Sequence, residues 1–252
     1  MRNDTGDNSA IGGFIITGNV PKHVIIRGIG PSLTKFGFSA AELLADPTLE
    51  VHGPGSFVTL TNNDWKDSQQ PQITAAGLAP SSDLEAAIDA TLSPGNYTAI
   101  LRGNGTGVGI GLIEVYDLSS SASKLANLST RALVRTGSAV VIAGFILGNN
   151  GGNDRIVVRG LGPSLGAFGI SNSLQDPTLE LRNQNGTLFA SNNDWTDEPG
   201  QAAEIAAAGL APSNPKESAI AVALAPGAYT ATLAGANGGE GVGTVEVYDR
   251  GP

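Results

Sequence analysis

The sequence predicts an all-β protein made of two tandem antiparallel β-sandwich domains, Greek-key or jelly-roll-like, that arose by internal duplication. Three observations lead to this prediction. A set of motifs occurs twice in the same order, and apolar residues alternate over short segments bounded by turn residues. Gly supplies 35 of the 252 residues while charged residues make up only 15%, which is typical of Gly-rich β structure with weakly charged surfaces.

The internal repeat defines the domain organisation. Five motifs recur at offsets of 130 to 132 residues: Arg27–Leu33 and Arg159–Leu165, Asp46–Glu50 and Asp176–Glu180, Asn62–Trp65 and Asn192–Trp195, Ala75–Ser81 and Ala207–Ser213, Glu114–Asp117 and Glu246–Asp249. We therefore expect domain one at 1–118, a flexible linker at 119–123 and domain two at 124–252. Met1 aligns with Ala132, so domain one is expected to lack the leading segment Lys124–Arg131 of domain two.

Alternating segments predict the strands. Tyr97–Leu101 and Tyr229–Leu233 keep Tyr, Ala and Leu at alternate positions, which indicates one buried face. Each is followed by Gly residues and a closing strand, so we expect a hairpin at the end of each domain. Segments that are apolar on both faces predict central strands, and these are Ile11–Ile16, Val24–Ile26, Val140–Leu147 and Ile156–Val158.

One helix is predicted, over Gln201–Ala208, because this segment contains strong helix formers. Asp197 is the expected N-cap, Pro199 falls in the first turn and Gly209 follows the end.

A repeated pattern marks the start of one strand in each domain. Leu92–Tyr97 and Leu224–Tyr229 share the pattern Leu-x-Pro-Gly-x-Tyr, which resembles the tyrosine corner of Greek-key sandwiches. We expect Tyr97 and Tyr229 to be buried with their hydroxyls bonded to backbone. The alternative is a plain turn before a strand.

Charge and composition exclude several classes of function. The net charge is −9 and the pI is about 4.6, so nucleic-acid backbones and anionic lipid headgroups would be repelled. The longest apolar stretch, Ala139–Leu147, has nine residues, whereas a membrane-spanning helix needs about twenty. Cys is absent, which excludes disulfides and thiolate chemistry. We expect neither nucleic-acid binding nor membrane insertion.

The succession of motifs resembles a known kind of module. Asp-Pro-Thr-Leu-Glu, an Asn-Gly turn at Asn185–Gly186, Asn-Asn-Asp-Trp, Leu-x-Pro-Gly-x-Tyr and Glu-Val-Tyr-Asp are similar to tandem β-sandwich repeats of large secreted bacterial surface proteins. More distantly they resemble bacterial pre-peptidase C-terminal domains. The resemblance implies an extracellular, non-catalytic role in attachment, spacing or presentation, with calcium bound in some relatives. Domain one departs from the pattern at Gly53–Gly55, which replaces the Asn-Gly turn.

Charged residues that match between the domains are the candidates for chemistry. They are the cation Arg27/Arg159 and the acids Asp46/Asp176, Glu50/Glu180, Asp64/Asp194, Asp67/Asp197, Glu85/Glu217, Glu114/Glu246 and Asp117/Asp249. His23 and His52 are not repeated, no nucleophile elbow occurs, and Gly-x-Gly-Pro-Ser is interpreted as a turn rather than a phosphate loop. Paired carboxylates can cleave glycosides, but few aromatics are present to form a sugar cleft, and we expect no enzymatic activity.

The Asn-Asn-Asp-Trp loops are the candidate metal sites. Calcium takes about six to eight oxygen ligands, and the loops offer Asn62, Asp64 and Asp67 in domain one and Asn192, Asp194 and Asp197 in domain two. The spacing is not that of an EF-hand. The alternative is an Asx-turn whose side chains bond local backbone, with Trp65 or Trp195 filling the edge of the core.

Arg27 and Arg159 lie in apolar strands, where an unpaired cation would be costly. We expect each to pair with a matched acid, either Asp46/Asp176 or Glu50/Glu180. A ligand-binding role for these Arg residues is the alternative.

Two functional classes remain. The first is a structural protein, a repeat subunit of a fibre, stalk or surface assembly built by head-to-tail packing of copies of itself. The second is a calcium-assisted adhesion module that binds polysaccharide or another surface, which would require exposed aromatics. For the first class we expect the sheet edge near Met1–Gly6 to meet another polypeptide, most simply the C-terminal region of a neighbouring copy, because an open edge is a pairing template.

Overall fold

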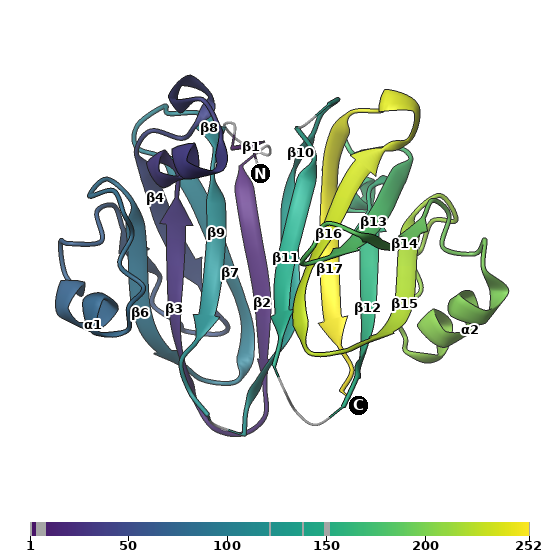
Figure 1. The fold of residues 1–252 in the computed structure, drawn as a ribbon, viewed down its shortest axis with the longest axis horizontal. Coiled ribbons are helices and arrows are strands. Elements are labelled where there is room, and N and C mark those ends of the chain that lie inside the picture. Colours follow the sequence, from purple (N-terminus) through teal and green to yellow (C-terminus); the bar gives the residue numbers. More distant parts are fainter. Residues whose placement is uncertain (1, 4–8, 121, 138, 149–151, 252) are drawn as a thin grey trace. The chain divides into compact units, whose positions relative to one another are not determined.

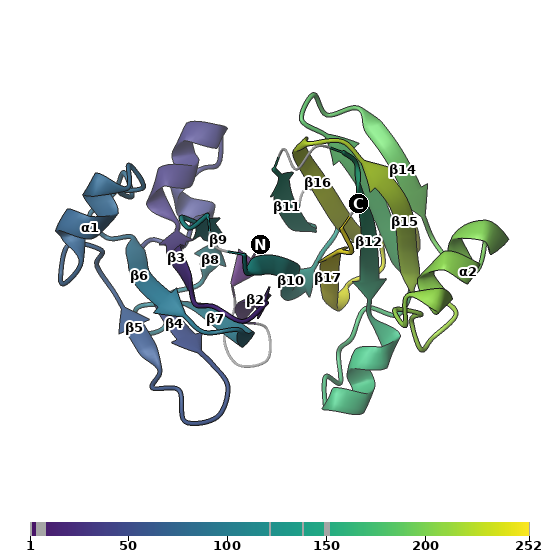
Figure 2. The same cartoon turned by 90° about the horizontal axis from the view of Figure 1, so that it is seen from below.

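The computed structural model divides the chain into two compact units, Met1–Ala126 and Asn127–Pro252, called unit 1 and unit 2 below (Figures 1 and 2). The structure describes all residues except 1, 4–8, 121, 138, 149–151 and 252. Each unit contains two antiparallel sheets whose inner faces share a hydrophobic core. This confirms the predicted all-β sandwich class.

Unit 1 has a four-stranded and a three-stranded sheet. The first has the order β2 (Ala10–Thr17), β7 (Gly95–Gly103), β4 (Pro47–His52) and β5 (Leu60–Asn62). The second has the order β6 (Ala86–Leu92), β3 (Lys22–Ile29) and β9 (Leu112–Asp117). A short ladder joins β1 (Arg2–Asn3) to β8 (Gly109–Ile110).

Unit 2 repeats this arrangement with one added strand. Its first sheet has the order β11 (Val141–Leu147), β16 (Gly227–Gly235), β13 (Pro177–Asn183) and β14 (Leu188–Asn192). Its second sheet has the order β15 (Ser218–Leu224), β12 (Asp154–Leu161), β17 (Gly241–Asp249) and β10 (Lys124–Val134). The predicted leading segment Lys124–Arg131 is therefore a strand, and β10 begins three residues before unit 2 does.

Alternation along the strands builds each core. In β4 the side chains of Pro47, Leu49 and Val51 are buried, and the intervening residues are half-buried. The core of unit 1 joins these to residues of the opposite sheet, including Val24, Ile26 and Ile88. A second, smaller cluster lies on the outer face of the three-stranded sheet and contains Ile25, Trp65, Ile73 and Ala87.

The predicted hairpin at the end of each domain is wrong. β7 pairs with β2 and β4, whereas the closing strand β9 pairs with β3 in the other sheet. Both strands point apolar side chains into the same core, where Leu101 packs with Ile113. The alternation of apolar residues is therefore the same whether two strands are hydrogen-bonded in one sheet or face each other from opposite sheets. The Gly residues serve a close approach instead. At Gly241 (φ 152°) a Cβ atom would lie 2.7 Å from the carbonyl oxygen of Asn172.

The expectation of a single helix is also wrong. Helix α2 (Pro199–Ala207) agrees with the predicted segment, but its N-cap is Glu198 rather than Asp197, because the helix begins at the Pro. A second helix, α1 (Gln70–Ala75), occupies the matched place in unit 1. Short 3₁₀ helices add to these, at Pro31–Phe36, Ala40–Glu42, Pro163–Phe168 and Ala236–Gly238. In α1, Gln and Thr replace Ala, which weakened the sequence signal, while burial of Ile73 stabilises the helix.

The prediction of a central strand over Val140–Leu147 is wrong as well. Among the described residues of unit 2, β11 pairs with β16 alone and stands at the edge of its sheet. Its outward side chains Ile142 and Ile146 are exposed, Ile146 to 79%. An apolar run is therefore not by itself proof of burial on both faces.

Candidate functional site

The Asn-Asn-Asp-Trp loops follow β5 and β14 and make the same bonds in both units. Asn62 Nδ2 donates to the carbonyl oxygen of Asp64 at 3.0 Å, and Asn62 Oδ1 accepts from the N–H of Ala87 at 2.9 Å. Asn192 makes the equivalent bonds to Asp194 and Ala219 at the same distances. Each Asn thus bonds the backbone of its own loop, as the Asx-turn alternative expects. Its second bond joins the loop to a strand of the opposite sheet.

The Trp of each loop packs on the outer face of a sheet. Trp65 is buried, and its Nε1 donates to the carbonyl oxygen of Ser82 at 3.1 Å. Trp195 is partly buried against a cluster that includes Val157 and Ile205. Both side chains hold a helix against the sheet, as a Trp at the edge of a core is expected to do.

Carboxylate oxygens without a hydrogen-bond partner recur at matched positions. Among the described residues, buried Oδ1 atoms of Asp46 and Asp64 in unit 1, and of Asp176 and Asp194 in unit 2, have no donor. Burial raises the pKa of Asp64, and the charges of Asp67 and Asp46 raise it further. Oxygens of this kind would be satisfied by a cation or by a ligand that donates hydrogen bonds.

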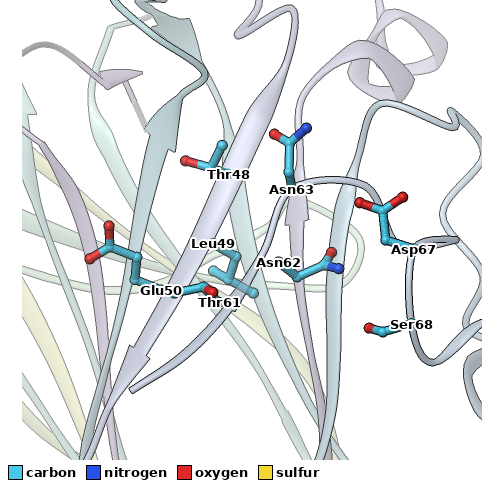
Figure 3. A pocket seen from close by; sticks show the side chains of 8 residues that line it. All are labelled: Thr48, Leu49, Glu50, Thr61, Asn62, Asn63, Asp67 and Ser68. Atoms are coloured by element: carbon cyan, nitrogen blue, oxygen red, sulfur yellow. The ribbon is translucent and has the colours of Figure 1, made fainter. Parts of the chain in front are cut away.

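A polar hollow lies beside the loop of unit 1. It has a volume of about 540 Å³ and is lined by residues of β4, β5 and the loop that follows: Thr48, Leu49, Glu50, Thr61, Asn62, Asn63, Asp67 and Ser68. Figure 3 shows Asn63, Asp67 and Ser68 on the loop side and Thr48 and Glu50 on the side of β4. The hollow brings Asn62 and Asp67 to one surface.

The calcium sites remain a prediction. Within the described part of the chain, no three His, Asp or Glu side chains are grouped so that they could hold a metal ion. Of the predicted ligands Asn62, Asp64, Asp67, Asn192, Asp194 and Asp197, the two Asn side chains are already bonded to backbone. The unpartnered oxygens of Asp46 and Asp176 lie outside the predicted loops, and the charge of Asp46 acts on Asp64. Asp46 and Asp176 were not among the predicted ligands, although their repetition in the sequence was a signal that could have identified them.

Arg27 and Arg159 do not have the predicted partners. Arg27 pairs with Glu114 and Arg159 with Glu246, in each case with 2.8 Å between Nε and Oε2. Strand register explains this correction, because Arg27 is directly opposite Glu114 on β9 and Arg159 is directly opposite Glu246 on β17. The predicted partners Asp46/Asp176 and Glu50/Glu180 lie at or near strands of the other sheet.

Each guanidinium has two further partners in its own unit. Arg27 donates to the hydroxyl of Tyr116 at 2.9 Å and to the carbonyl oxygen of Leu78 at 2.8 Å, and Arg159 makes the matching bonds to Tyr248 and Leu210. Burial, and then the adjacent Glu, raises the pKa of both Tyr hydroxyls. These bonds join the last strand of each unit, β9 or β17, to the loop after its helix, α1 or α2. The guanidinium therefore has a structural role.

The Gly-x-Gly-Pro-Ser turns are held by the buried carboxylates Glu85 and Glu217. Glu85 Oε1 accepts from the N–H groups of Gly30 and Ser32 at 3.0 and 2.8 Å, and its second oxygen accepts from the Ser32 hydroxyl and from Ser82 N–H. Glu217 Oε1 likewise accepts from the N–H groups of Gly162 and Ser164, and here also from the Ser164 hydroxyl. The motif is thus a turn that begins a 3₁₀ helix. The side chain of the matched Glu accepts the hydrogen bonds of the N–H groups in that turn.

The tyrosine corner occurs in both units, with unequal burial. Tyr97 is 4% exposed, and its hydroxyl donates to the carbonyl oxygen of Ser93 at 2.8 Å. Tyr229 makes the same bond to Ala225 at 2.9 Å but is only half-buried. The backbone bond is confirmed for both residues, whereas the expected burial is confirmed for Tyr97 alone.

The last strands of the two units differ in their neighbours. β17 pairs with β12 on one side and with β10 on the other, from Asn127 opposite Tyr248 to Val134 opposite Gly241. β9 pairs with β3 alone among the described residues. Val245 and Val247 are 0% and 5% exposed, whereas the matched Ile113 and Val115 are half-buried. The edge of β9 is therefore the candidate site for association.

Exposed aromatics also recur. Phe36 and Phe168 end the matched 3₁₀ helices and are 76% and 81% exposed. Each is presented by a turn that the buried Glu fixes. Such rings are available to a partner surface.

Comparisons with known proteins give no family. No protein-family model and no curated protein matches the chain. A solved structure described as the crystal structure of the STIV MCP is similar to this chain, with 14% sequence identity, 99% of this chain and 93% of that chain covered, and a TM-score of 0.27. Among the described residues, no helix is long and apolar enough to cross a membrane.

Proposed function

We propose that the chain is a non-catalytic structural protein, a repeat subunit that assembles with copies of itself into a fibre, stalk or surface layer outside the cell. The observation that supports this most strongly is the unequal completion of two equivalent sandwiches. Among the residues that the structure describes, β17 has a strand on both sides and β9 has a strand on one. The extracellular location rests on the resemblance to repeats of secreted bacterial proteins, and the low content of charged residues fits the structural role.

The difference between β9 and β17 bears on assembly because of the backbone groups that an edge strand exposes. An edge strand presents unpaired N–H and C=O groups, and a second chain can bind them by adding a strand. When the donor and the acceptor lie on different surfaces of the subunit, the contact is head-to-tail and grows into a filament unless it closes.

The matched charged clusters support a structural role. Arg27, Glu114 and Glu85, with their counterparts in unit 2, all bind groups of their own unit. They stabilise loops and strands in the same way in both copies. A scaffold duplicated with these internal bonds is suited to repetition and spacing.

Sedimentation velocity, combined with electron microscopy, tests the proposal. The purified chain should form oligomers whose size grows with concentration, and elongated particles should appear. Ile146→Lys is the control variant, because it removes an exposed apolar side chain of β11 and leaves the sequence of β9 unchanged. Assembly should persist in this variant. A single monomeric species at all concentrations would refute the proposal.

A second candidate function is a calcium-assisted module that binds polysaccharide or another surface. The unpartnered Asp oxygens in both units and the exposed rings of Phe36 and Phe168 favour it. Calcium would occupy the acid-rich loops, and the rings would contact the ligand. Binding of the chain to insoluble polysaccharide in calcium, with release by chelator, tests this function.

A further inference from the structure

The polar hollow of unit 1 is lined by groups that the fold does not use. The hydroxyls of Thr61 and Ser68 and the carboxylate of Asp67 line it, and they form no hydrogen bond or ion pair with other residues that the structure describes. The buried Oδ1 atom of Asn63, another lining residue, also lacks a donor within that part of the chain. Figure 3 shows Asp67 and Ser68 on the other side of the hollow from Thr61. These groups are therefore available to a ligand.

The second carboxylate of the lining, Glu50, is oriented by contacts from outside the hollow. Its Oε2 lies 3.2 Å from Nε2 of His52, and its Oε1 lies 3.8 Å from Nε of Arg102. Neither His52 nor Arg102 is a lining residue. Asn62 is fixed as well, by two hydrogen bonds to backbone. Part of the wall is thus held in place, while the hollow itself contains no cation among its lining residues.

The lining selects the chemistry of a ligand. Carboxylate and amide oxygens accept hydrogen bonds, hydroxyls accept or donate them, and Leu49 is the one apolar residue of the lining. An anionic ligand would be repelled by Asp67, and an apolar one would leave the polar groups without partners. A neutral ligand rich in hydroxyls supplies a donor for each free oxygen. The volume of about 540 Å³ is within the range of about 300 to 1,000 Å³ that small-molecule sites have.

We propose that this hollow is a binding site for a neutral saccharide unit. The inference rests on the second candidate function and locates its polysaccharide ligand. The free groups of Thr61, Asp67 and Ser68 bind hydroxyls on one side of the sugar, and the carboxylate of Glu50 accepts a hydrogen bond from the other side. The ligand is held by hydrogen bonds, so a saccharide that carries acidic groups is excluded by charge.

The chemistry of the lining is repeated in unit 2. Seven of the eight lining residues have a match that is identical or exchanges one hydroxyl for another: Thr178, Leu179, Glu180, Ser191, Asn192, Asn193 and Asp197. Other residues of the same sheet have changed, because Ile100 is matched by Thr232 and His52 by Arg182. Polar groups that the fold does not use are thus retained at the hollow. A second site in the same chain would strengthen binding to a polymer through avidity.

Retention of the full chain by immobilised polysaccharides, with calcium present throughout, tests the inference. The neutral polysaccharides are cellulose, mannan and starch, and each is paired with its carboxymethylated form, which has the same backbone and added negative charge. We expect retention by at least one neutral polysaccharide and much weaker retention by its carboxymethylated form. No retention by any neutral polysaccharide, or equal retention by the charged form, would overturn the proposal.

Amide chemical shifts locate the site on the full chain. An oligosaccharide of the retained polysaccharide should shift the amide signals of Thr61, Asn63 and Ser68. Thr61→Val combined with Ser68→Ala removes both free hydroxyls and should weaken binding in unit 1 about tenfold. Thr59→Val is the matched control, because it makes the same change two residues away and outside the lining, and it should leave binding unchanged. The Tm of each variant shows whether it is folded.

Two results of this titration would overturn the proposal. One is an unchanged affinity of the double variant. The other is a set of shifts confined to the 3₁₀ helices that carry Phe36 and Phe168, which would place the ligand on those rings.

The failures of the two proposals are distinguishable. If a polysaccharide retains the chain but the double variant binds as tightly as the wild type, the hollow is refuted and the polysaccharide-binding function stands. If no polysaccharide retains the chain, both are refuted. Retention that the double variant weakens and Thr59→Val does not supports both.

Discussion

β9 in unit 1 and β17 in unit 2 share a sequence pattern but have different neighbours. Both carry a Glu that binds an Arg of the adjacent strand, β3 or β12, and a Tyr whose hydroxyl bonds the same Arg. β17 also has β10 along its outer edge, and its inward Val residues are buried, whereas those of β9 are half-buried. Burial in a sandwich thus depends on the next strand as much as on the sequence of the strand itself.

Some features of each unit depend on that copy's own residues, whereas the burial of its last strand depends on a neighbouring strand. Turns, ion pairs and cores are built from residues of the same copy, so they should respond to substitution equally in both units. The last strand depends on a neighbour, so its response should differ. Each unit has one Trp, Trp65 or Trp195, and a Trp195→Phe or Trp65→Phe background therefore lets fluorescence follow the unfolding of one unit at a time.

Loss of the buried carboxylate should have the largest effect, and it should be equal in both units. Glu85→Ala and Glu217→Ala leave one buried and one partly buried N–H group of each turn without an acceptor. We expect a loss of roughly 3 kcal/mol in the free energy of unfolding of the affected unit. Denaturant titration followed by the Trp of that unit measures it. A large loss in only one unit would show that the two frameworks are not equivalent.

Truncation of a matched Val should reveal the missing neighbour. Val247→Ala removes buried apolar surface and should cost unit 2 about 2 kcal/mol, whereas Val115→Ala should cost unit 1 about 1 kcal/mol, because Val115 is half-buried. The same titrations compare them. Equal losses would mean that the edge of β9 is as well covered as that of β17.

The tyrosine corners should differ in the opposite direction, with the larger loss in unit 1, for another reason. Tyr97→Phe removes a hydrogen bond of a buried hydroxyl and should cost about 1 kcal/mol, while Tyr229→Phe should cost less, on the order of 0.5 kcal/mol. Thermal unfolding of the two variants gives the comparison. A larger loss from Tyr229→Phe would contradict the observed burial.

The acidic loops should give the smallest effect. The folded-state pKa of Asp64 is raised above 3.8, so the stability that this carboxyl contributes is present below that pH and is lost as the pH rises through the folded-state value. At neutral pH, Asp64→Asn should leave the Tm of unit 1 unchanged or slightly raised.

If calcium binds there, it should raise the Tm of the wild-type chain, and Asp64→Asn should abolish the part of this rise that belongs to unit 1. Asp194→Asn is the matched control in unit 2. Identical melting curves in calcium and in chelator would remove the calcium function.

Sequence patterns identified the sandwich class, the repeat and the bonds of the tyrosine corner, because each depends on residues close in sequence. They missed the partners of Arg27 and Arg159, which strand register sets between residues 87 positions apart. They also predicted a hairpin where the chain crosses between sheets, since inward alternation is the same for both arrangements. The role of Glu85 and Glu217 needed the fold, because the turns that they hold lie 53 to 55 residues away.

Residue-resolved hydrogen exchange of the isolated chain, at a concentration where it is monomeric, tests the central claim most directly. The account predicts that amides on the outer edge of β9, within Leu112–Tyr116, exchange at least tenfold faster than the matched amides of β17, within Thr244–Tyr248, while amides facing β3 and β12 are protected alike. Equal protection of the two outer edges would contradict the claim that β9 is open and β17 is not.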